Sequence, residues 1–362
     1  MGKKLLRRSV LKASVLGGIA ASTFPNPAIS KRRHRFKMVT CFPKKFPGLG
    51  MTAERIADDI FQLSEGRIEV KVYGAGEIVP AYEVFDAVRE GVAELGYGWD
   101  GYWISKHSGA AYFGGVPGGL TPSEQVSWIL YGGGSKLWDE LWMPFGIKPF
   151  LAGVNQTEMF GWYKNPLNSL SDLKGLKIRM AGLPSEILNR MGATAVNIPG
   201  GEIMSSFQSG VVDAVEWGGP WMDLAFGFPK ICKICYAPGI HSPDSSLALY
   251  VNKDIFDSLS EDLKKIIQVA AEKSTPHLYG EIMYYNAQSF EVITNKHKVD
   301  YKLLPKDIVR DFLKIGEDVV NENAEKDPFS KKVYLSYKSF LDQSKNITLY
   351  QEQGYLNSRG SW

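Results

Sequence analysis

Short strand-like segments alternate with helix-like segments along this chain, and this alternation limits the fold more than any other feature. Ile68, Val70 and Val72 alternate with polar residues, as in a half-buried strand. An alternating order of strands and helices predicts an α/β fold with largely parallel sheets. Strands are predicted at residues 37–40, 67–73, 92–97, 149–154, 158–164, 176–180, 211–217 and 247–252, and helices at 52–64, 80–90, 122–141, 184–191 and 201–208.

The chain becomes mainly helical after residue 254, and its last helix-like segment, residues 331–341, has an apolar face. A face of this kind needs a partner, which is either the lobe it belongs to or a second copy of the chain. The face consists of Val333, Tyr337, Phe340 and Leu341, and the other helices predicted in this region are 260–274, 279–294 and 305–323.

The first 30 residues have the pattern of an export signal. A basic stretch that contains the pair Arg7-Arg8 precedes a weakly apolar run at residues 13–21, and small residues such as Ala28 follow. The arginine pair resembles the twin-arginine export signal. The apolar run is shorter than the roughly 20 residues that a membrane-spanning helix needs. We therefore expect a protein that is soluble in the periplasm after residues 1–30 are removed.

Charge and motifs argue against two other classes of protein. The formal net charge is +3 and much of the basic excess lies in the first 37 residues, so the folded part lacks the basic stripe of a nucleic-acid binder. The sequence has no GxSxG, HExxH or Walker A motif, so we expect no enzyme and no catalytic residues. Cys232 and Cys235 lack the second ligand pair of a zinc site and are interpreted as small residues in an apolar segment.

Two charged residues lie where predicted strands end. Arg179 lies near the end of one strand, from which a planar guanidinium can reach into a cleft and hold a carboxylate through two parallel hydrogen bonds. Glu216 ends another beside Trp217, and a buried carboxylate there needs a cation or several donors. The alternative for both charged residues is ordinary exposure at the surface.

Neutral residues near these strand ends add further candidates. The amide oxygen of Gln156 can ligate a hard cation or a substrate hydroxyl. Aromatic residues of the same region suit the walls of a small, dry pocket, although each of them alone could equally pack in a core. This aromatic set is Trp99, Tyr102, Trp103, Trp217 and Trp221.

A series of short motifs across nearly the whole chain after the signal resembles the DctP-type extracytoplasmic solute receptors of tripartite ATP-independent periplasmic (TRAP) transporters. The closest resemblance is to the branch that binds 2-oxo acids and lactate. The motifs are Glu-Ile-Val-Pro at 77–80, Phe-Asp-Ala-Val at 85–88, Gly-Val-Ala-Glu at 91–94, Thr-Pro-Ser-Glu-Gln at 121–125, Tyr-Gly-Gly-Gly at 131–134, Leu-Trp-Asp-Glu-Leu at 137–141, Leu-Lys-Gly-Leu-Lys-Ile-Arg at 173–179, Pro-Gly-Gly-Glu at 199–202 and Asp-Ala-Val-Glu-Trp-Gly-Gly-Pro at 213–220.

The resemblance implies a set of site residues. The arginine that matches Arg179 clamps the carboxylate of the ligand, and a tyrosine that matches Tyr102 lies near a substrate oxygen. A metal ion bridges ligand and protein in this branch. Its ligands match Gln156, the carboxylate of Glu216 and the main-chain oxygen of Trp217.

The resemblance also implies the architecture, a two-lobed periplasmic binding protein fold with crossing hinge strands and a long helical C-terminal region. We expect lobe I to contain residues 37–150 with about 213–250, and lobe II to contain residues 151–212 with about 251–325. Residues 326–362 then form a helical tail, which in this branch pairs two protomers, so we expect a homodimer.

The implied function is capture of a small 2-oxo or 2-hydroxy monocarboxylate, such as pyruvate, 2-oxobutyrate or lactate, for delivery to the membrane permease. The loops at 102–107 and 241–244 depart from their commonest forms, and both are expected to line the pocket. A dicarboxylate or a sugar acid is therefore an alternative ligand, which a second arginine or lysine in the pocket would favour. An exported enzyme acting on a carboxylate is a further alternative, which turnover of candidate acids would reveal.

Charge explains why a cation is expected beside Glu216. Two carboxylates about 4 Å apart repel by about 4 kcal/mol at an effective dielectric constant of 20, and a cation between them reverses the sign. The expected donors are all oxygens, which select Na⁺, Ca²⁺ or Mg²⁺. Charge balance slightly favours Ca²⁺, whereas the resemblance allows Na⁺ equally.

Overall fold

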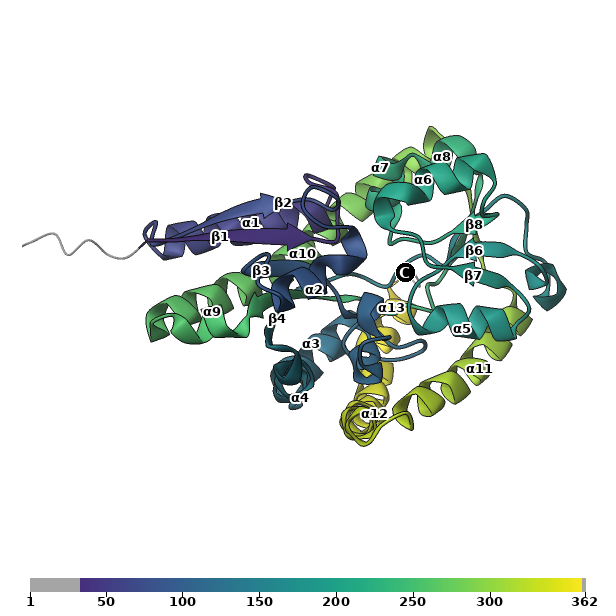
Figure 1. Ribbon diagram of the computed structural model, residues 1–362. Helices are drawn as coiled ribbons and strands as arrows, with labels where there is room; N and C mark the ends of the chain where they lie inside the picture. Colours follow the sequence, from purple (N-terminus) through teal and green to yellow (C-terminus); the bar gives the residue numbers. More distant parts are fainter. Residues whose placement is uncertain (1–32, 360–362) are drawn as a thin grey trace, which may run out of the picture. The chain divides into compact units, whose positions relative to one another are not determined.

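The computed structural model describes residues 33–359 of the chain. The predicted export signal at residues 1–30 lies outside the described residues. Within the described part of the chain, no helix is both long and apolar enough to cross a membrane. Two mixed sheets, each covered by helices, make up this part, which confirms the predicted α/β class (Figure 1).

The first sheet has five strands and carries the N-terminal part of the described chain. Its strand β1 pairs in parallel with β2 and β3, whereas β10 runs antiparallel to β3 and β4. Helix α1 (Leu49–Leu63) packs on β2, and α2 (Val84–Arg89) packs on β3. The order across the sheet is β2 (Ile68–Tyr73), β1 (His34–Thr40), β3 (Leu95–Trp99), β10 (Ser246–Asn252) and β4 (Ile147–Val154).

The second sheet has six strands, most of them short. Strand β6 pairs in parallel with β7 and β8, and β5 runs antiparallel to β8 and β9. Helix α5 (Leu183–Arg190) packs on β7 and α6 (Gly200–Ser209) on β8. The order across this sheet is β11 (Asp300–Leu303), β9 (Ile234–Ala237), β5 (Gly161–Tyr163), β8 (Ala214–Val215), β6 (Lys177–Arg179) and β7 (Thr194–Val196).

Three connections join the sheets within the described residues, and two of them run side by side. Residues 155–160 lead from β4 to β5, and residues 238–245 lead back from β9 to β10. The amide of Asn155 donates to the carbonyl of Ser245 at 2.9 Å, and the amide of Glu158 donates to that of Ser242 at 3.3 Å. These two segments, which we call the crossing connections, therefore hold each other in register between the sheets.

The structure moves the expected lobe boundaries. Residues 213–250 were assigned to lobe I, but β8 and β9 within that range belong to the second sheet, and only β10 belongs to the first. Helix α9 (Lys253–Ser258), assigned to lobe II, packs on β4 and β10. The reason is that the chain returns to the first sheet only at residues 238–245, two strands later than the boundary near residue 213 that the resemblance implied. Hereafter, lobe I and lobe II mean the first and second sheets with the helices packed on them.

Helix α10 (Glu261–Asn295) is one continuous helix of 35 residues, where the sequence predicted two helices. Pro276 lies inside it. A proline inside a helix removes one hydrogen bond and disfavours the helix locally. Here α10 packs against α1, β4 and α7 (Pro220–Phe226), and Ser274 Oγ donates to the Ala152 carbonyl at 2.7 Å. We attribute the continuity of the helix to this packing.

The predicted helix at 122–141 instead divides into α3 (Pro122–Leu130) and α4 (Gly134–Trp142), because Gly133 adopts a φ of 88° between them.

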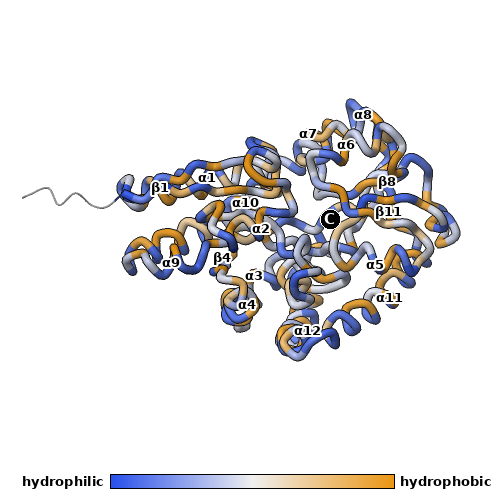
Figure 2. The backbone as a smooth tube through the Cα atoms, viewed as in Figure 1, coloured by the Kyte–Doolittle hydropathy of each residue, from blue (hydrophilic) through white to orange (hydrophobic). Residues whose placement is uncertain are grey.

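The C-terminal helices pack mainly on the chain itself. Helix α11 (Lys306–Ala324) lies on α5, and α12 (Pro328–Thr348) lies on α3 and α4. Figure 2 shows apolar and polar residues alternating along α11. Two residues of the apolar face at 331–341, Val333 and Tyr337, are buried within the chain itself. The Tyr337 hydroxyl accepts a hydrogen bond from the Leu120 amide at 2.8 Å. Exposed apolar residues occur later, in the π-helical segment Leu349–Gln353 and in α13 (Gly354–Ser358).

Candidate ligand-binding site

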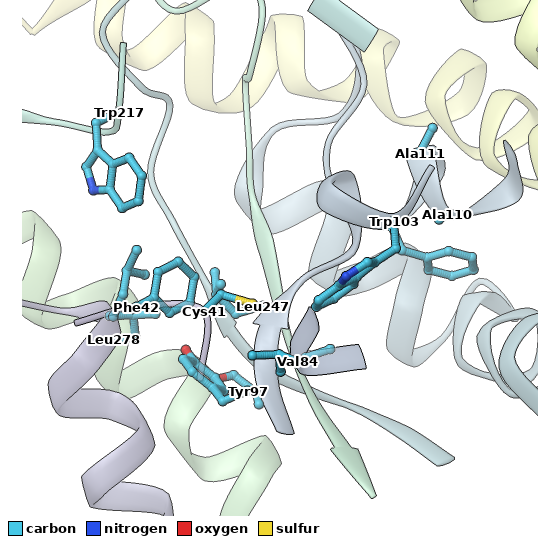
Figure 3. Close-up of a cluster of buried hydrophobic side chains, with 14 of the residues drawn as sticks. Cys41, Phe42, Val84, Tyr97, Trp103, Ala110, Ala111, Trp217, Leu247 and Leu278 are labelled. Carbon is cyan, nitrogen blue, oxygen red and sulfur yellow. The ribbon is translucent and has the colours of Figure 1, made fainter. Parts of the chain in front are cut away.

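A cavity of about 50 Å³ lies between the crossing connections, the ends of β6 and β8, and the aromatic residues after β1 and β3. Its apolar walls include Phe42, Trp99 and Trp217. The Phe42 ring lies between those of Tyr97 and Trp217, with centroid distances of 5.9 and 6.3 Å (Figure 3). Phe42 thus joins the core of lobe I to an aromatic residue of lobe II at the edge of the cavity.

Arg179 ends β6 and is buried, with an exposed fraction of 2%. Its Nη1 atom donates to both carboxylate oxygens of Glu216, at 2.9 and 3.1 Å, and to the main-chain oxygen of Glu216 at 2.9 Å. Its Nε atom donates to the Ile198 carbonyl at 3.2 Å, and its guanidinium carbon lies 5.1 Å from the centre of the Trp217 ring. Arg179 is therefore fixed in orientation while it lines the cavity.

The electrostatics of this pair depend on burial. Burial raises the pKa of the Glu216 carboxyl above its ordinary value, while the charges of Arg179 and His241 lower it. Burial alone would lower the pKa of Arg179, but the charge of Glu216 holds it above its ordinary value. Because a guanidinium nitrogen lies 2.9 Å from a carboxylate oxygen, the two residues form a buried ion pair.

A second polar group faces the same cavity from the crossing connections. Glu158 is buried, and its Oε1 atom accepts hydrogen bonds from Asn155 Nδ2 at 2.9 Å and Ser245 Oγ at 3.0 Å. The Nε2 atom of His241 lies 3.4 Å from Glu158 Oε2 and 3.9 Å from Glu216 Oε1. Glu158 was not among the residues that the sequence singled out, although an acidic residue at the start of an apolar strand, two residues after Gln156, is a possible signal. The loop that contains His241 was expected to line the pocket.

Tyr102 and Trp217 both line the cavity. The Tyr102 ring lies edge-on to Trp99 at 5.0 Å and tilted against Tyr82 at 4.8 Å, and burial raises the pKa of its hydroxyl. Burial also raises the pKa of Tyr82 to about 12, against the lowering effect of Arg179. The Tyr82 hydroxyl donates to Asn197 Oδ1 at 2.7 Å, so a hydrogen bond joins the two lobes near the guanidinium.

Gln156 is not among the residues that line the cavity. Its Oε1 atom accepts a hydrogen bond from Asn286 Nδ2 of α10 at 2.9 Å, and its Nε2 atom contacts the sulfur of Met283. The structure thus brings Arg179, Glu216, Trp217 and Tyr102 together and places Gln156 beside α10. Of the other aromatic candidates, Trp99 lines the cavity, Trp103 packs in the core and Trp221 stacks on Tyr285 at 4.6 Å.

The residues around the cavity fit a metal ion. One ligand atom from each of Glu158, Glu216 and His241 can be chosen so that all three lie within 4.8 Å of one another, and all three residues are buried. Neither ring nitrogen of His241 has a hydrogen bond of ordinary geometry within residues 33–359. Buried polar atoms without partners are uncommon in folded proteins. A cation bound to one ring nitrogen of His241 would give that nitrogen a partner.

Comparisons with known proteins identify the family of the chain. The family model "bacterial extracellular solute-binding protein, family 7" matches residues 43–327. The chain is 33% identical over 329 residues to a monocarboxylate 2-oxoacid-binding periplasmic protein of Nostoc sp., covering 90% of this chain and 89% of that protein.

Two crystal structures share the fold over nearly their whole length. A TRAP periplasmic solute-binding protein of Pseudoalteromonas atlantica with bound sodium and pyruvate has a TM-score of 0.87 and 30% identity, covering 90% of this chain and 99% of that one. A TRAP transporter solute-binding protein of Bordetella bronchiseptica has a TM-score of 0.89 and 25% identity, covering 91% of this chain and 98% of that one. That structure is a mixed-occupancy dimer with calcium and picolinate in one site.

The two-sheet α/β fold of this chain is the fold of these periplasmic solute-binding proteins. The chain belongs to family 7 of the bacterial extracellular solute-binding proteins, the DctP family, whose members are receptors. It is a solute-binding protein of the TRAP transporter type, which confirms the resemblance seen in the sequence.

Proposed function

We propose that this protein captures a small 2-oxo or 2-hydroxy monocarboxylate in the periplasm and delivers it to the membrane subunits of a TRAP transporter. The observation that carries this proposal is Arg179, a buried guanidinium held in place by Glu216 and Ile198 beside a small aromatic cavity. A fixed guanidinium holds a carboxylate with little loss of conformational freedom on binding. The Nostoc relative is named for 2-oxoacids and the Pseudoalteromonas protein has pyruvate bound, which supports the same ligand class here.

Within the described residues that line the cavity, Arg179 is the only arginine or lysine. A dicarboxylate would leave its second carboxylate without a positive partner in a buried site, which is unfavourable. The small volume of the cavity also suits a ligand of few atoms. Both observations favour a monocarboxylate over the alternatives.

We propose that Glu216 holds a cation that bridges protein and ligand, with the Trp217 carbonyl as a further donor. When bound, the cation supplies positive charge between the Glu216 carboxylate and the anionic ligand. Arg179 orients the carboxylate of the ligand, Tyr102 lies beside its oxygen atoms, and the aromatic walls exclude water. The relatives with sodium or calcium beside their ligands support this arrangement.

The test is calorimetric titration of the exported protein with pyruvate, 2-oxobutyrate and lactate, compared with succinate and gluconate. We expect the three monocarboxylates to bind and the other two acids to bind at least tenfold more weakly. Tight binding of succinate would overturn the ligand class, and turnover of any acid would show an enzyme.

N-terminal sequencing of the periplasmic protein tests export, for which we expect cleavage between about residues 24 and 31.

A further inference from the structure

The loop between β1 and α1, residues 41–48, reaches from lobe I to lobe II. Its Phe46 ring lies 4.6 Å from that of Phe226, at the end of α7, and 6.2 Å from that of Trp217, which follows β8. Phe226 in turn stacks on the buried ring of Phe228 at 5.1 Å. Phe46 therefore extends the aromatic core of lobe II from the side of lobe I.

The backbone of the loop fixes the direction in which Phe46 points. The Phe46 amide donates to the Pro43 carbonyl at 3.1 Å, and the Phe46 carbonyl accepts from the Met51 amide at 3.1 Å. Lys45 has a φ of 59°, a left-handed conformation that a residue with a side chain keeps only where the surrounding structure imposes it. The loop can fold back on α1 because residue 50 is glycine, where a Cβ atom would lie 2.2 Å from the Pro43 carbonyl oxygen. Phe46 is thus presented to lobe II by a tightly built turn.

Trp217 is the residue through which this contact reaches the binding site. It lines the cavity, and the guanidinium carbon of Arg179 lies 5.1 Å from the centre of its ring. The rings of Phe42 and Phe46 both meet Trp217 edge-on, with interplanar angles of 84°. On the side of α6, a Cβ atom at Gly200 would lie 2.5 Å from the indole. The orientation of Trp217 therefore depends on residues of lobe I as well as on its own lobe.

Phe46 itself is not among the residues that line the cavity, so any effect it has on the ligand is indirect. We propose that Phe46 is a positioning residue. Its contact with Phe226 and Trp217, which we call the aromatic latch, holds the lobes together and keeps Trp217 against Arg179 while the ligand is bound. The inference rests on the proposed function only for the identity of the ligand.

The latch acts mainly on the release of the ligand. Separation of the lobes takes the rings of Phe46 and Phe226 apart and exposes them to water, which costs the free energy of their burial. The ligand has to leave through that separated state, whereas it enters before the latch has formed. Loss of the latch should therefore raise the dissociation rate and leave the association rate nearly unchanged.

The experiment measures both rates with pyruvate by stopped-flow recording of intrinsic fluorescence, to which Trp217 contributes from the cavity wall. We expect Phe46→Ala to raise the dissociation rate at least about fivefold and to change the association rate by less than about twofold. Phe46→Leu keeps an apolar side chain and should dissociate more slowly than Phe46→Ala. The matched control is Phe61→Ala, at a phenylalanine of α1 that is 48% exposed, which should change neither rate.

A second variant tests whether Phe46 acts through lobe II. If Phe46 and Phe226 share one contact, the double variant Phe46→Ala/Phe226→Ala should raise the dissociation rate by less than the product of the two single effects. Circular dichroism and the melting temperature identify a variant that fails to fold, and in that case Phe226→Leu replaces Phe226→Ala. Single effects that multiply in the double variant would overturn the latch, as would an unchanged dissociation rate in Phe46→Ala.

The outcomes also separate this proposal from the proposed function. Pyruvate binding with wild-type rates in Phe46→Ala would refute the latch and leave the function intact. A wild-type protein that binds none of the monocarboxylates would refute the function, and hydrogen exchange of the ligand-free protein then decides about the latch. We expect Phe46→Ala, but not Phe61→Ala, to speed amide exchange in α7 on the opposite lobe. Unaltered exchange in α7 would overturn the latch.

Discussion

The Nη1 atom of Arg179 donates to the carboxylate and to the main-chain oxygen of one residue, Glu216. The main-chain bond, at 2.9 Å, comes from the end of β8, which is paired with the strand that carries Arg179. The orientation of the guanidinium is therefore set by the second sheet itself. A receptor site that is organised in advance loses less free energy on binding its ligand.

Replacing Arg179 by lysine keeps the positive charge and removes the planar fork. We expect Arg179→Lys to lower affinity for pyruvate at least tenfold, which corresponds to about 1.4 kcal/mol, because a single ammonium group cannot keep the contacts with Glu216 and Ile198 and also present a nitrogen to the ligand carboxylate. The matched control is Arg190→Lys, which changes an arginine of α5 that pairs with Glu322 away from the cavity. Unchanged pyruvate binding by calorimetry in Arg179→Lys would remove Arg179 from the site.

Metal removal should weaken ligand binding. Without a cation, the ligand carboxylate faces Glu216 directly, and this repulsion offsets much of what Arg179 contributes. We expect chelated protein in sodium-free buffer to bind pyruvate at least tenfold more weakly, and restored cation to recover the affinity. Glu216→Gln should show weaker binding that no longer depends on added cation. Full affinity in the stripped protein would mean that Glu216 serves only to hold Arg179.

The hydrogen bond from Tyr82 to Asn197 joins lobe I to lobe II beside the cavity. A single hydrogen bond contributes about 1 kcal/mol net. We expect Tyr82→Phe to weaken pyruvate binding by roughly two- to fivefold, mainly through a faster dissociation rate, because the closed arrangement loses this contact. Stopped-flow measurement of intrinsic fluorescence gives the rates. Tyr131→Phe, at a residue that is 91% exposed, is the control and should change neither rate. An unaltered dissociation rate in Tyr82→Phe would contradict the prediction.

Asp100 introduces a dependence of stability on pH. Its carboxylate is fully buried and accepts hydrogen bonds from Trp138 at 2.6 Å and Trp142 at 3.1 Å, as well as from Tyr250. Burial raises its pKa to about 7, while these hydrogen bonds lower it. The folded protein therefore binds this proton more tightly than the unfolded chain does. The stability that this proton contributes to the folded state is fully present below about pH 4 and is lost as the pH rises to about 7.

The variant Asp100→Asn isolates this contribution. We expect the stability of the wild type relative to Asp100→Asn to fall by on the order of 3 kcal/mol between pH 4 and pH 8, as measured by urea unfolding. Asp223, whose pKa burial raises to about 8, contributes to both proteins and cancels in the difference. The control Asp254→Asn, at an exposed position, should show no such trend. A difference that is constant with pH would contradict the prediction.

The sequence allowed the fold class to be predicted, and for physical reasons it also pointed to Arg179 and Glu216, which line one cavity. Arg179 and Glu216 each interrupt an apolar strand, and a charge in that position has few stable environments. Glu158 could not be found in the same way, because its partners Asn155, Ser245 and His241 are brought together only by the pairing of the two crossing connections. The side chain of Gln156 could not be oriented from sequence either, since its direction depends on contacts with α10.

The same reasoning explains the errors in the fold. The sequence predicted two helices, 260–274 and 279–294, where α10 is continuous through Pro276, and one helix at 122–141, where the backbone at Gly133 separates α3 from α4. The boundary near residue 213 failed because apolar strands of both lobes look alike in sequence. Only strand pairing shows that β8 and β9 belong to the second sheet.

The C-terminal segment carries our last prediction, that the mature protein forms a homodimer. Val333 and Tyr337 are covered within the chain, so they do not supply the contact. Beyond them the end of α12 and the segment after it expose apolar residues, which a soluble protein tends to cover. These are Ile347, Leu349, Tyr350, Tyr355 and Leu356, with exposed fractions between 51% and 81%.

We expect light scattering to show a dimer at micromolar concentration and a monomer after deletion of residues 346–362. Because this segment makes no part of the cavity, the truncated protein should still bind pyruvate with the affinity of the full chain. The dimeric relative from Bordetella bronchiseptica supports the expectation. Leu335→Ser, which changes an exposed residue of α12 outside the segment, is the control and should leave the dimer intact. A full-length protein that is monomeric at these concentrations would refute the prediction, as would a truncated protein that remains dimeric.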